Sequence, residues 1–342
     1  MEELVYYYPK GHELHAQTGH PERPQRVEEI VKAFRETGLW ESYLQIEPMD
    51  ISLDFIATVH SQHYINELHS ACRVGEMLDM DTYTTPASWQ IALATVGGAV
   101  ALAEKVWHQA AHRGFALTRP PGHHATRHRG MGFCLLNNIA LAAQYLITTH
   151  QAQRLAILDF DLHHGNGTQD IFYDRKDVFY ISTHQSPLYP GSGMLEEIGA
   201  GEGKGFTANF PLPPGSGDEA FQTIMGEVIL ALLEKYQPEM LLISYGFDSH
   251  WRDPLGHLQL SAQGYGELIA ELCNWADEHC QGRVAIFLEG GYDLDAARAC
   301  SLAVVLAMLG QKWEDPLGKS PRPESQSWKS MLAQSKQIWN IF

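Results

Sequence analysis

The segment Leu155-Ala-Ile-Leu-Asp-Phe-Asp161-Leu-His163 decides the fold class of this chain of 342 residues. Residues 155–158 form an apolar run without alternation, which is typical of a strand buried on both faces of a parallel sheet. Polar residues follow at once, and in such sheets ligands bind beyond the carboxyl ends of the strands. Apolar runs of the same kind recur along the chain. They lie at 115–118, 178–181, 240–243 and 284–288.

Helical patterns alternate with these runs, which predicts an α/β fold with a doubly wound, mostly parallel sheet and helices on both faces. The expected helices are 24–37, 86–111, 136–149, 218–235, 262–279 and 296–309. Glycine-rich stretches near 191–205 and 211–217 are predicted to be long loops, and no repeat or linker divides the chain. Residues 1–342 are therefore expected to form a single domain. The tail 321–342, which carries Trp328, Trp339 and Phe342, is expected to pack on the body.

Composition narrows the function before any motif is considered. The net charge of −17 argues against a nucleic-acid binder, which needs a basic face. Five scattered cysteines without a CxxC pair predict reduced thiols and a cytoplasmic location. We expect neither a signal peptide nor a membrane span, because the apolar runs are too short. Any metal chemistry must come from carboxylates and from some of the 18 histidines.

Candidate metal ligands follow two of the predicted strands. Asp161 and His163 stand two residues apart, so in an extended segment their side chains point the same way. Asp248 follows the run 240–243 and completes a set of one histidine and two aspartates. Three protein ligands and a water molecule make the open arrangement of a catalytic zinc site. By the same alternation His164 points away, and we expect a structural role for it.

Candidate proton-transfer groups follow two other strands. Arg119-Pro-Pro-Gly-His123-His124 comes after the run 115–118, and histidine titrates near neutral pH. Glu289-Gly-Gly-Tyr292 comes after the run 284–288, where paired glycines allow a close backbone approach and aim the tyrosine. Because parallel strands end at one edge of a sheet, these groups are expected to converge on the metal ligands.

Taken together, these motifs resemble the zinc-dependent histone deacetylase family, which has the arginase/deacetylase fold. The matching segments are His20-Pro-Glu-Arg-Pro-Gln-Arg26, Arg119-Pro-Pro-Gly-His-His124, Gly132-Phe-Cys134 with Asn137, residues 159–167, Gly246-Phe-Asp248 and Glu289-Gly-Gly-Tyr292. Asn166, within Gly165-Asn-Gly-Thr-Gln169, is more similar to the class II branch and its bacterial deacetylase-like amidohydrolases. Class I members usually have aspartate at this position.

The resemblance implies a catalytic Zn²⁺ bound by Asp161, His163 and Asp248. A zinc-bound water would attack the acyl carbon of an acylated amine, and zinc would polarise the carbonyl. An Asp₂His site is not strongly selective, so Fe²⁺ and Co²⁺ stay open as the native metal.

The resemblance also implies the catalytic roles of five further residues. His124 would be the general base and then the acid that protonates the leaving amine. His123 would give electrostatic support, with its orientation fixed by Asp159. Asn166 would lie behind His124 and supply no carboxylate charge. Tyr292 would donate its hydroxyl to the developing oxyanion.

Substrate and potassium sites complete what the resemblance implies. Substrate-binding residues would be Gly132 and Phe133 on one wall of a tunnel, Tyr189 on the opposite wall, and Leu255 where polyamine-selecting relatives have an acidic gatekeeper. One structural K⁺ would be bound by Asp159, Asp161, His163, Ser182 and Thr183. A second K⁺ would be bound at the carbonyls of Phe172, Arg175 and Val178.

The predicted function is zinc-dependent removal of an acyl group, such as acetyl, from acylated lysine or a similar amine. Acetylpolyamine deacetylation is the main alternative, although Leu255 offers no anchor for a distant cationic amine. A binuclear manganese ureohydrolase is less consistent, because Ser249 and His250, not a further aspartate, follow Asp248. An inactive acyl-lysine binding module should have lost a metal ligand, the histidine pair or the tyrosine. All of these are present, so this alternative ranks last. The expected partner is a small acylated amine or an acyl-lysine peptide. We expect no nucleic-acid or membrane partner. A homo-oligomer and a monomer are both consistent with the sequence.

Overall fold

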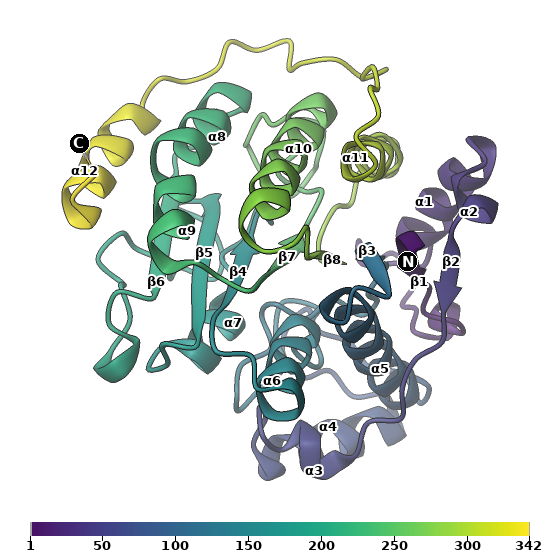
Figure 1. Cartoon of the computed structure of the whole chain (residues 1–342). Helices are drawn as coiled ribbons and strands as arrows, with labels where there is room; N and C mark the ends of the chain where they lie inside the picture. The colour runs from purple at the N-terminus through teal and green to yellow at the C-terminus, as the bar shows by residue number, and fades with distance from the viewer. Residues whose placement is uncertain (1, 342) are drawn as a thin grey trace.

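The computed structural model describes residues 2–341, and within this range eight strands form one sheet in the order β2-β1-β3-β8-β7-β4-β5-β6 (Figure 1). All neighbouring strands pair in parallel. The strands are β1 Glu2–Tyr7, β2 Leu44–Ile46, β3 Ala111–Ala116, β4 Leu155–Asp159, β5 Val178–Gln185, β6 Thr207–Leu212, β7 Met240–Tyr245 and β8 Val284–Leu288. The predicted α/β fold with a parallel sheet is confirmed.

Helices cover both faces of this sheet. On one face lie α1, α8, α9, α10 and α11, and on the other lie α4, α5 and α6 (Figure 1). The helices are α1 Gln25–Glu36, α2 Leu39–Ser42, α3 Leu53–Ile56, α4 Gln62–Val74, α5 Ser88–Trp107, α6 Asn138–His150, α7 Asn166–Phe172, α8 Asp218–Ile224, α9 Leu230–Tyr236, α10 Ala262–His279, α11 Leu294–Met308 and α12 Trp328–Trp339. A π-helical turn, Met225–Ile229, joins α8 to α9.

Two hydrophobic cores explain why the strands read as continuous apolar runs. In β4, Ala156 and Leu158 belong to the core beneath α8–α11, whereas Leu155 and Ile157 belong to the core beneath α5 and α6. Successive side chains of a strand point to opposite faces, so a strand covered on both faces needs apolar residues at every position. The runs at 178–181, 240–243 and 284–288 are strands for the same reason.

The predicted helix 86–111 was wrong at its end. The helix α5 ends at Trp107, and Gln109 has a φ of +55°, which a continuing helix does not allow. Ala111 is already the first residue of β3, which pairs with β1 and β8. Only Phe115 and Ala116 of the run at 115–118 belong to this strand, which begins earlier and ends earlier than predicted. Sheet pairing overrides the helical pattern before the run.

The second predicted loop was also wrong at its start, because Pro211 and Leu212 belong to strand β6. This strand lies at the edge of the sheet, where a residue without an N–H is tolerated. Beyond it, α12 packs near β6 in the tail, with Trp328 buried and the Trp339 ring centroid 5.9 Å from that of Phe179. Phe342 lies outside the described residues.

Among the described residues, no helix is both long and apolar enough to cross a membrane.

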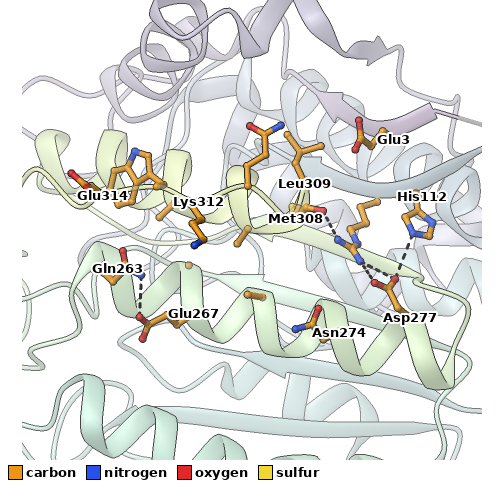
Figure 2. A pocket seen from close by; sticks show the side chains of 18 residues that line it. Glu3, His112, Gln263, Glu267, Asn274, Asp277, Met308, Leu309, Lys312 and Glu314 are labelled. Carbon is orange, nitrogen blue, oxygen red and sulfur yellow. Dashed lines mark hydrogen bonds and ion pairs between the residues drawn. The ribbon is translucent and has the colours of Figure 1, made fainter.

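A cavity of about 800 Å³ lies between α10, α11 and residues 309–314 (Figure 2). His112 and Asp277 line it, and their side chains lie 3.5 Å apart (Figure 2). His112 is near the amino end of β3, whereas the motifs follow the carboxyl ends of the strands. The cavity and the motifs are therefore at opposite ends of the strands.

Candidate active site

The carboxyl ends of the neighbouring strands β3, β8, β7 and β4 bring the predicted residues together. Asp161 and His163 lie in the loop after β4, and Asp248 lies after β7. His163 Nδ1 lies 3.3 Å from both Asp161 Oδ1 and Asp248 Oδ2. One potential ligand atom from each residue lies within 4.8 Å of the other two. The three residues predicted to bind the metal therefore form one cluster.

The oxygen atoms of this cluster fit a bound cation. Asp248 Oδ2 is buried and makes no hydrogen bond within residues 2–341, whereas its Oδ1 accepts one from the Leu162 amide at 3.0 Å. Asp161 Oδ2 accepts a hydrogen bond from the Gly290 amide at 2.8 Å. A buried carboxylate oxygen without a hydrogen bond is costly unless a cation balances its charge. One imidazole and two carboxylates suit Zn²⁺ and related divalent ions.

Two glycines leave space for the carboxylates. A β-carbon at Gly246 would lie 1.9 Å from Asp161 Oδ2, and one at Gly290 would lie 2.2 Å from Asp248 Oδ2. Any side chain at either position would push a carboxylate out of the cluster. This contact is the physical reason for glycine in both motifs.

The cluster attracts positive charge. Burial alone would lower the pKa of His163, but Asp161 and Asp248 raise it to about 9. Burial opposes ionisation of Asp161, yet His123 and His163 hold its pKa far below the usual range. Carboxylates that hold a proton on an imidazole also favour a metal cation, which binds the neutral imidazole in place of that proton.

His123 lies next to the cluster, where its surroundings favour the protonated imidazole. Its Nδ1 lies 3.1 Å from Asp159 Oδ2. Burial alone would lower the pKa of His123, but Asp161, Asp159 and Glu289 raise it to about 10. Tyr180 also donates a hydrogen bond to Asp159 Oδ2 at 3.2 Å, which fixes this carboxylate.

His124 is a neutral base beside it. Its Nδ1 lies 2.8 Å from Asn166 Oδ1, and Asn166 Nδ2 contacts the Met131 sulfur at 3.5 Å. Because an amide oxygen only accepts hydrogen bonds, Nδ1 carries the hydrogen and Nε2 has the lone pair. Burial, then the charges of His123 and His163, lower the pKa of His124 well below 6.5.

Tyr292 is held at its backbone and its ring. Its amide donates a hydrogen bond to Asp253 Oδ2 at 2.7 Å, and Arg26 Nε donates to the Gly291 carbonyl at 2.6 Å. The Arg26 guanidinium lies 4.9 Å from the centroid of the Tyr292 ring. Burial raises the pKa of Tyr292 well above 10, so the hydroxyl keeps its proton and can donate a hydrogen bond.

Of the four predicted tunnel residues, Gly132, Phe133 and Tyr189 lie against His124 or Tyr292. A β-carbon at Gly132 would lie 2.5 Å from the His124 ring, and Phe133 packs edge-on against Tyr292 with centroids 5.8 Å apart. Tyr189 packs edge-on against His124 at 5.3 Å and is 40% exposed, so it reaches the surface. Leu255 is half-buried, and its amide donates to Asp253 Oδ1 at 3.0 Å.

The two groups of residues predicted to bind potassium lie in different places: the first is at the carboxyl end of β4 and in β5, and the second runs from the end of α7 to the start of β5. Ser182 pairs with Asp159 across β4 and β5, and the buried Thr183 hydroxyl makes no hydrogen bond within residues 2–341. In the second group, the Phe172 carbonyl accepts a hydrogen bond from the Arg175 amide at 3.0 Å, and Val178 begins β5.

His164 has a structural place, as alternation predicts. Its Nδ1 lies 2.8 Å from Ser192 Oγ and its Nε2 lies 3.0 Å from Gln169 Oε1. Both ring nitrogens are therefore engaged away from the metal-ligand cluster.

Sequence reasoning gave no role to Glu289, whose carboxylate supports the histidine loop. Its Oε2 accepts hydrogen bonds from the Gly122 and His123 amides at 2.7 and 3.1 Å. Its Oε1 accepts one from Ser244 Oγ at 2.9 Å. The sequence signal for this role is the position of Glu289, directly after the buried strand β8.

A second unassigned carboxylate, Glu22, ties together distant segments. It is fully buried and accepts hydrogen bonds from Arg119 Nε at 2.7 Å and from Arg26 at 3.1 Å. Burial opposes its charge, but Arg119 and Arg26 lower the pKa of Glu22 to about 2. The network connects the first loop to the loops that carry His123 and Tyr292.

The fold and the site define a hydrolase. A parallel α/β sheet gathers a cluster suited to a metal ion, a neutral histidine base and a protonated tyrosine at one edge. These are the parts needed to add water to a carbonyl carbon.

Similarity to known proteins shows to which family of hydrolases the chain belongs. Residues 20–308 match the histone deacetylase domain family. A probable deacetylase of Archaeoglobus fulgidus is 41% identical over 294 residues, which cover 85% of this chain and 82% of the relative. A histone deacetylase-like amidohydrolase of Pseudomonas aeruginosa is 35% identical, over 88% and 80% of the two chains. The crystal structure of the HDA15 HD domain matches with a TM-score of 0.90, 30% identity and coverage of 99% and 94%.

The chain belongs to the histone deacetylase family, as the sequence motifs predicted. It is accordingly a hydrolase that acts on amide bonds, and its family acts on acetylated substrates.

Proposed function

We propose that this protein is a zinc-dependent deacetylase that removes acetyl or similar acyl groups from acylated lysine. The carrying observation is the convergence of the three-residue metal cluster with His124 and Tyr292 at one sheet edge. Zn²⁺ would be bound by Asp161, His163 and Asp248, whose donor atoms lie within 4.8 Å of one another. When bound, such an ion polarises the acyl carbonyl and lowers the pKa of a water molecule.

The proton path runs through His124. Its neutral Nε2 removes a proton from the attacking water as the new C–O bond forms at the acyl carbon. The same nitrogen then gives this proton to the amine nitrogen as the C–N bond breaks, leaving a carboxylate and a free amine. Asn166 holds Nδ1 and so keeps the lone pair on Nε2.

Two other residues meet the developing charge. The Tyr292 hydroxyl donates a hydrogen bond to the oxyanion, because its raised pKa keeps it protonated. The positive charge of His123, maintained by Asp159, lies where it stabilises negative charge at the reacting carbon. Arg26 and Asp253 hold the Tyr292 backbone and ring in place.

The proposed function also includes a substrate site, two potassium sites, a single catalytic domain and a location. We propose that Gly132, Phe133, Tyr189 and Leu255 enclose the acyl-lysine side chain. Asp159, Asp161, His163, Ser182 and Thr183 would bind one K⁺, and Phe172, Arg175 and Val178 a second. We propose that residues 1–342 form one catalytic domain. The five free, buried cysteines support a reducing, cytoplasmic location.

Acetyl-lysine is expected to be the better substrate class. Leu255 presents an apolar side chain where a polyamine substrate would need an anionic partner for its distant ammonium. We therefore expect a higher kcat/KM for an acetyl-lysine peptide than for N-acetylputrescine, measured by release of acetate. A higher value for N-acetylputrescine would contradict the proposed specificity and support the polyamine alternative. An acetyl-lysine peptide of reversed net charge is the control for effects of the overall charge of −17.

Asn166→Asp is expected to move the acidic limb of the pH profile of kcat/KM to higher pH. A carboxylate 2.8 Å from His124 Nδ1 favours the protonated imidazole and raises the pKa of His124. Because the base acts in its neutral form, activity then begins to fall at a higher pH as the solution is acidified. Asp170→Asn, on the same helix, is the control. An unchanged profile in Asn166→Asp would show that His124 is not the group that titrates.

A further inference from the structure

A second cluster of metal-ligating side chains lies far from the candidate active site. It consists of Glu104 and His108 on and beside the last turn of α5, and His150 at the end of α6. Helix α5 leads into the amino end of β3, and α6 leads towards the amino end of β4. The cluster is therefore near the amino ends of the strands, whereas Asp161, His163 and Asp248 follow their carboxyl ends.

The geometry brings the three side chains to one point. His150 Nε2 lies 3.0 Å from Glu104 Oε1, and the rings of His108 and His150 have centroids 4.4 Å apart and lie nearly perpendicular. One ligand atom of each residue lies within 4.8 Å of the other two. Glu104 and His108 are four residues apart, which places both on one face of the helix end. Two imidazoles and a carboxylate match the His₂Glu ligand set of zinc sites.

The surroundings favour a cation at this point. Tyr145 donates a hydrogen bond to Glu104 Oε1 at 3.1 Å and orients the carboxylate, as outer-shell partners do at metal sites. Both α5 and α6 end here, and the carbonyl groups at helix C-termini carry partial negative charge. Glu104 and His150 are half-buried and His108 is exposed, so an ion can enter from solvent.

We propose that Glu104, His108 and His150 form a second site for a divalent transition-metal ion such as Zn²⁺. The ion would join α5 to α6, which lie side by side but are separated in sequence by β3 and the His123–His124 loop (Figure 1). His150 would bind through the nitrogen that now faces Glu104, and the proton between them would leave to solvent. The bound ion would stabilise the folded protein and would take no part in the chemistry at the candidate active site.

The test is the number of Zn²⁺ ions retained per chain after metal removal and equilibrium dialysis against micromolar free Zn²⁺. His108→Ala and Glu104→Gln are each expected to retain one ion fewer than the wild-type protein. His63→Ala, which removes an exposed histidine of α4, is the matched control and should retain the wild-type number. The difference between wild type and variant does not depend on whether the candidate active site binds zinc.

Thermal unfolding gives a second readout that does not require activity. Zn²⁺ should raise the Tm of the wild-type protein and of His63→Ala more than that of His108→Ala, since a ligand of the folded state stabilises it. Equal Zn²⁺ retention in wild type and both cluster variants would overturn the proposal. Loss of the same ion in His63→Ala would also overturn it.

Discussion

His124→Ala is expected to lower kcat for an acetyl-lysine peptide by about 10²–10⁴-fold, the range of general acid–base catalysis. His124 is the neutral member of the histidine pair, and its Nδ1 is engaged by Asn166. Without it, the water proton loses its proposed acceptor. His123 is a poor replacement, because Asp161, Asp159 and Glu289 outweigh burial and raise the pKa of His123 to about 10. KM should change much less than kcat.

Steady-state kinetics with metal content measured on the same samples tests this expectation. His128→Ala is the matched control, because His128 lies on the same loop but is exposed. It should keep near wild-type turnover. If His124→Ala kept more than a tenth of the wild-type kcat with its metal bound, the proton path through His124 would be wrong.

Tyr292→Phe is expected to lower kcat by about 10²–10³-fold, as removal of an oxyanion donor does in other hydrolases. The substitution deletes one hydroxyl and keeps the ring that packs against Phe133 and Arg26. Metal content and Tm should therefore stay at wild-type values, and the loss should appear in kcat with little change in KM.

Tyr189→Phe separates the role of this hydroxyl from aromatic packing in general. Tyr189 also packs against His124, but it is 40% exposed, and its proposed place is in the outer wall of the substrate site. Its hydroxyl is not proposed to meet the oxyanion, so Tyr189→Phe should keep kcat within a few-fold of wild type. Equal losses in the two variants would mean that Tyr292 acts through packing and not as a donor.

The central strands and their polar ends could be predicted because a single physical rule governs both. A strand covered on both faces needs apolar residues at every position, and parallel strands end at one edge. The apolar runs therefore predict β4, β5, β7 and β8, and the polar residues that follow them predict that Asp161, His163 and Asp248 lie together. Alternation along the chain also orients His164 away from the metal-ligand cluster, where Ser192 and Gln169 engage it.

The edges of the fold and the supporting carboxylates could not be predicted in this way. The strand β6 contains Pro211, which is tolerated only because the strand lies at the sheet edge, and edge position is a property of the whole sheet. Glu22 and Asp253 act on residues far away in the sequence: Glu22 accepts from Arg119, and Asp253 from the Tyr292 amide. No local pattern reports such pairings.

The dependence of turnover on a bound metal ion tests the proposed zinc-dependent function. The protein should be stripped with a chelator, freed of the chelator by dialysis, and assayed with an acetyl-lysine peptide before and after addition of Zn²⁺. We expect turnover to be lost in the metal-free protein and to return with Zn²⁺, because the proposed role of Asp161, His163 and Asp248 is to bind this ion. Full turnover in protein shown to be metal-free would contradict it.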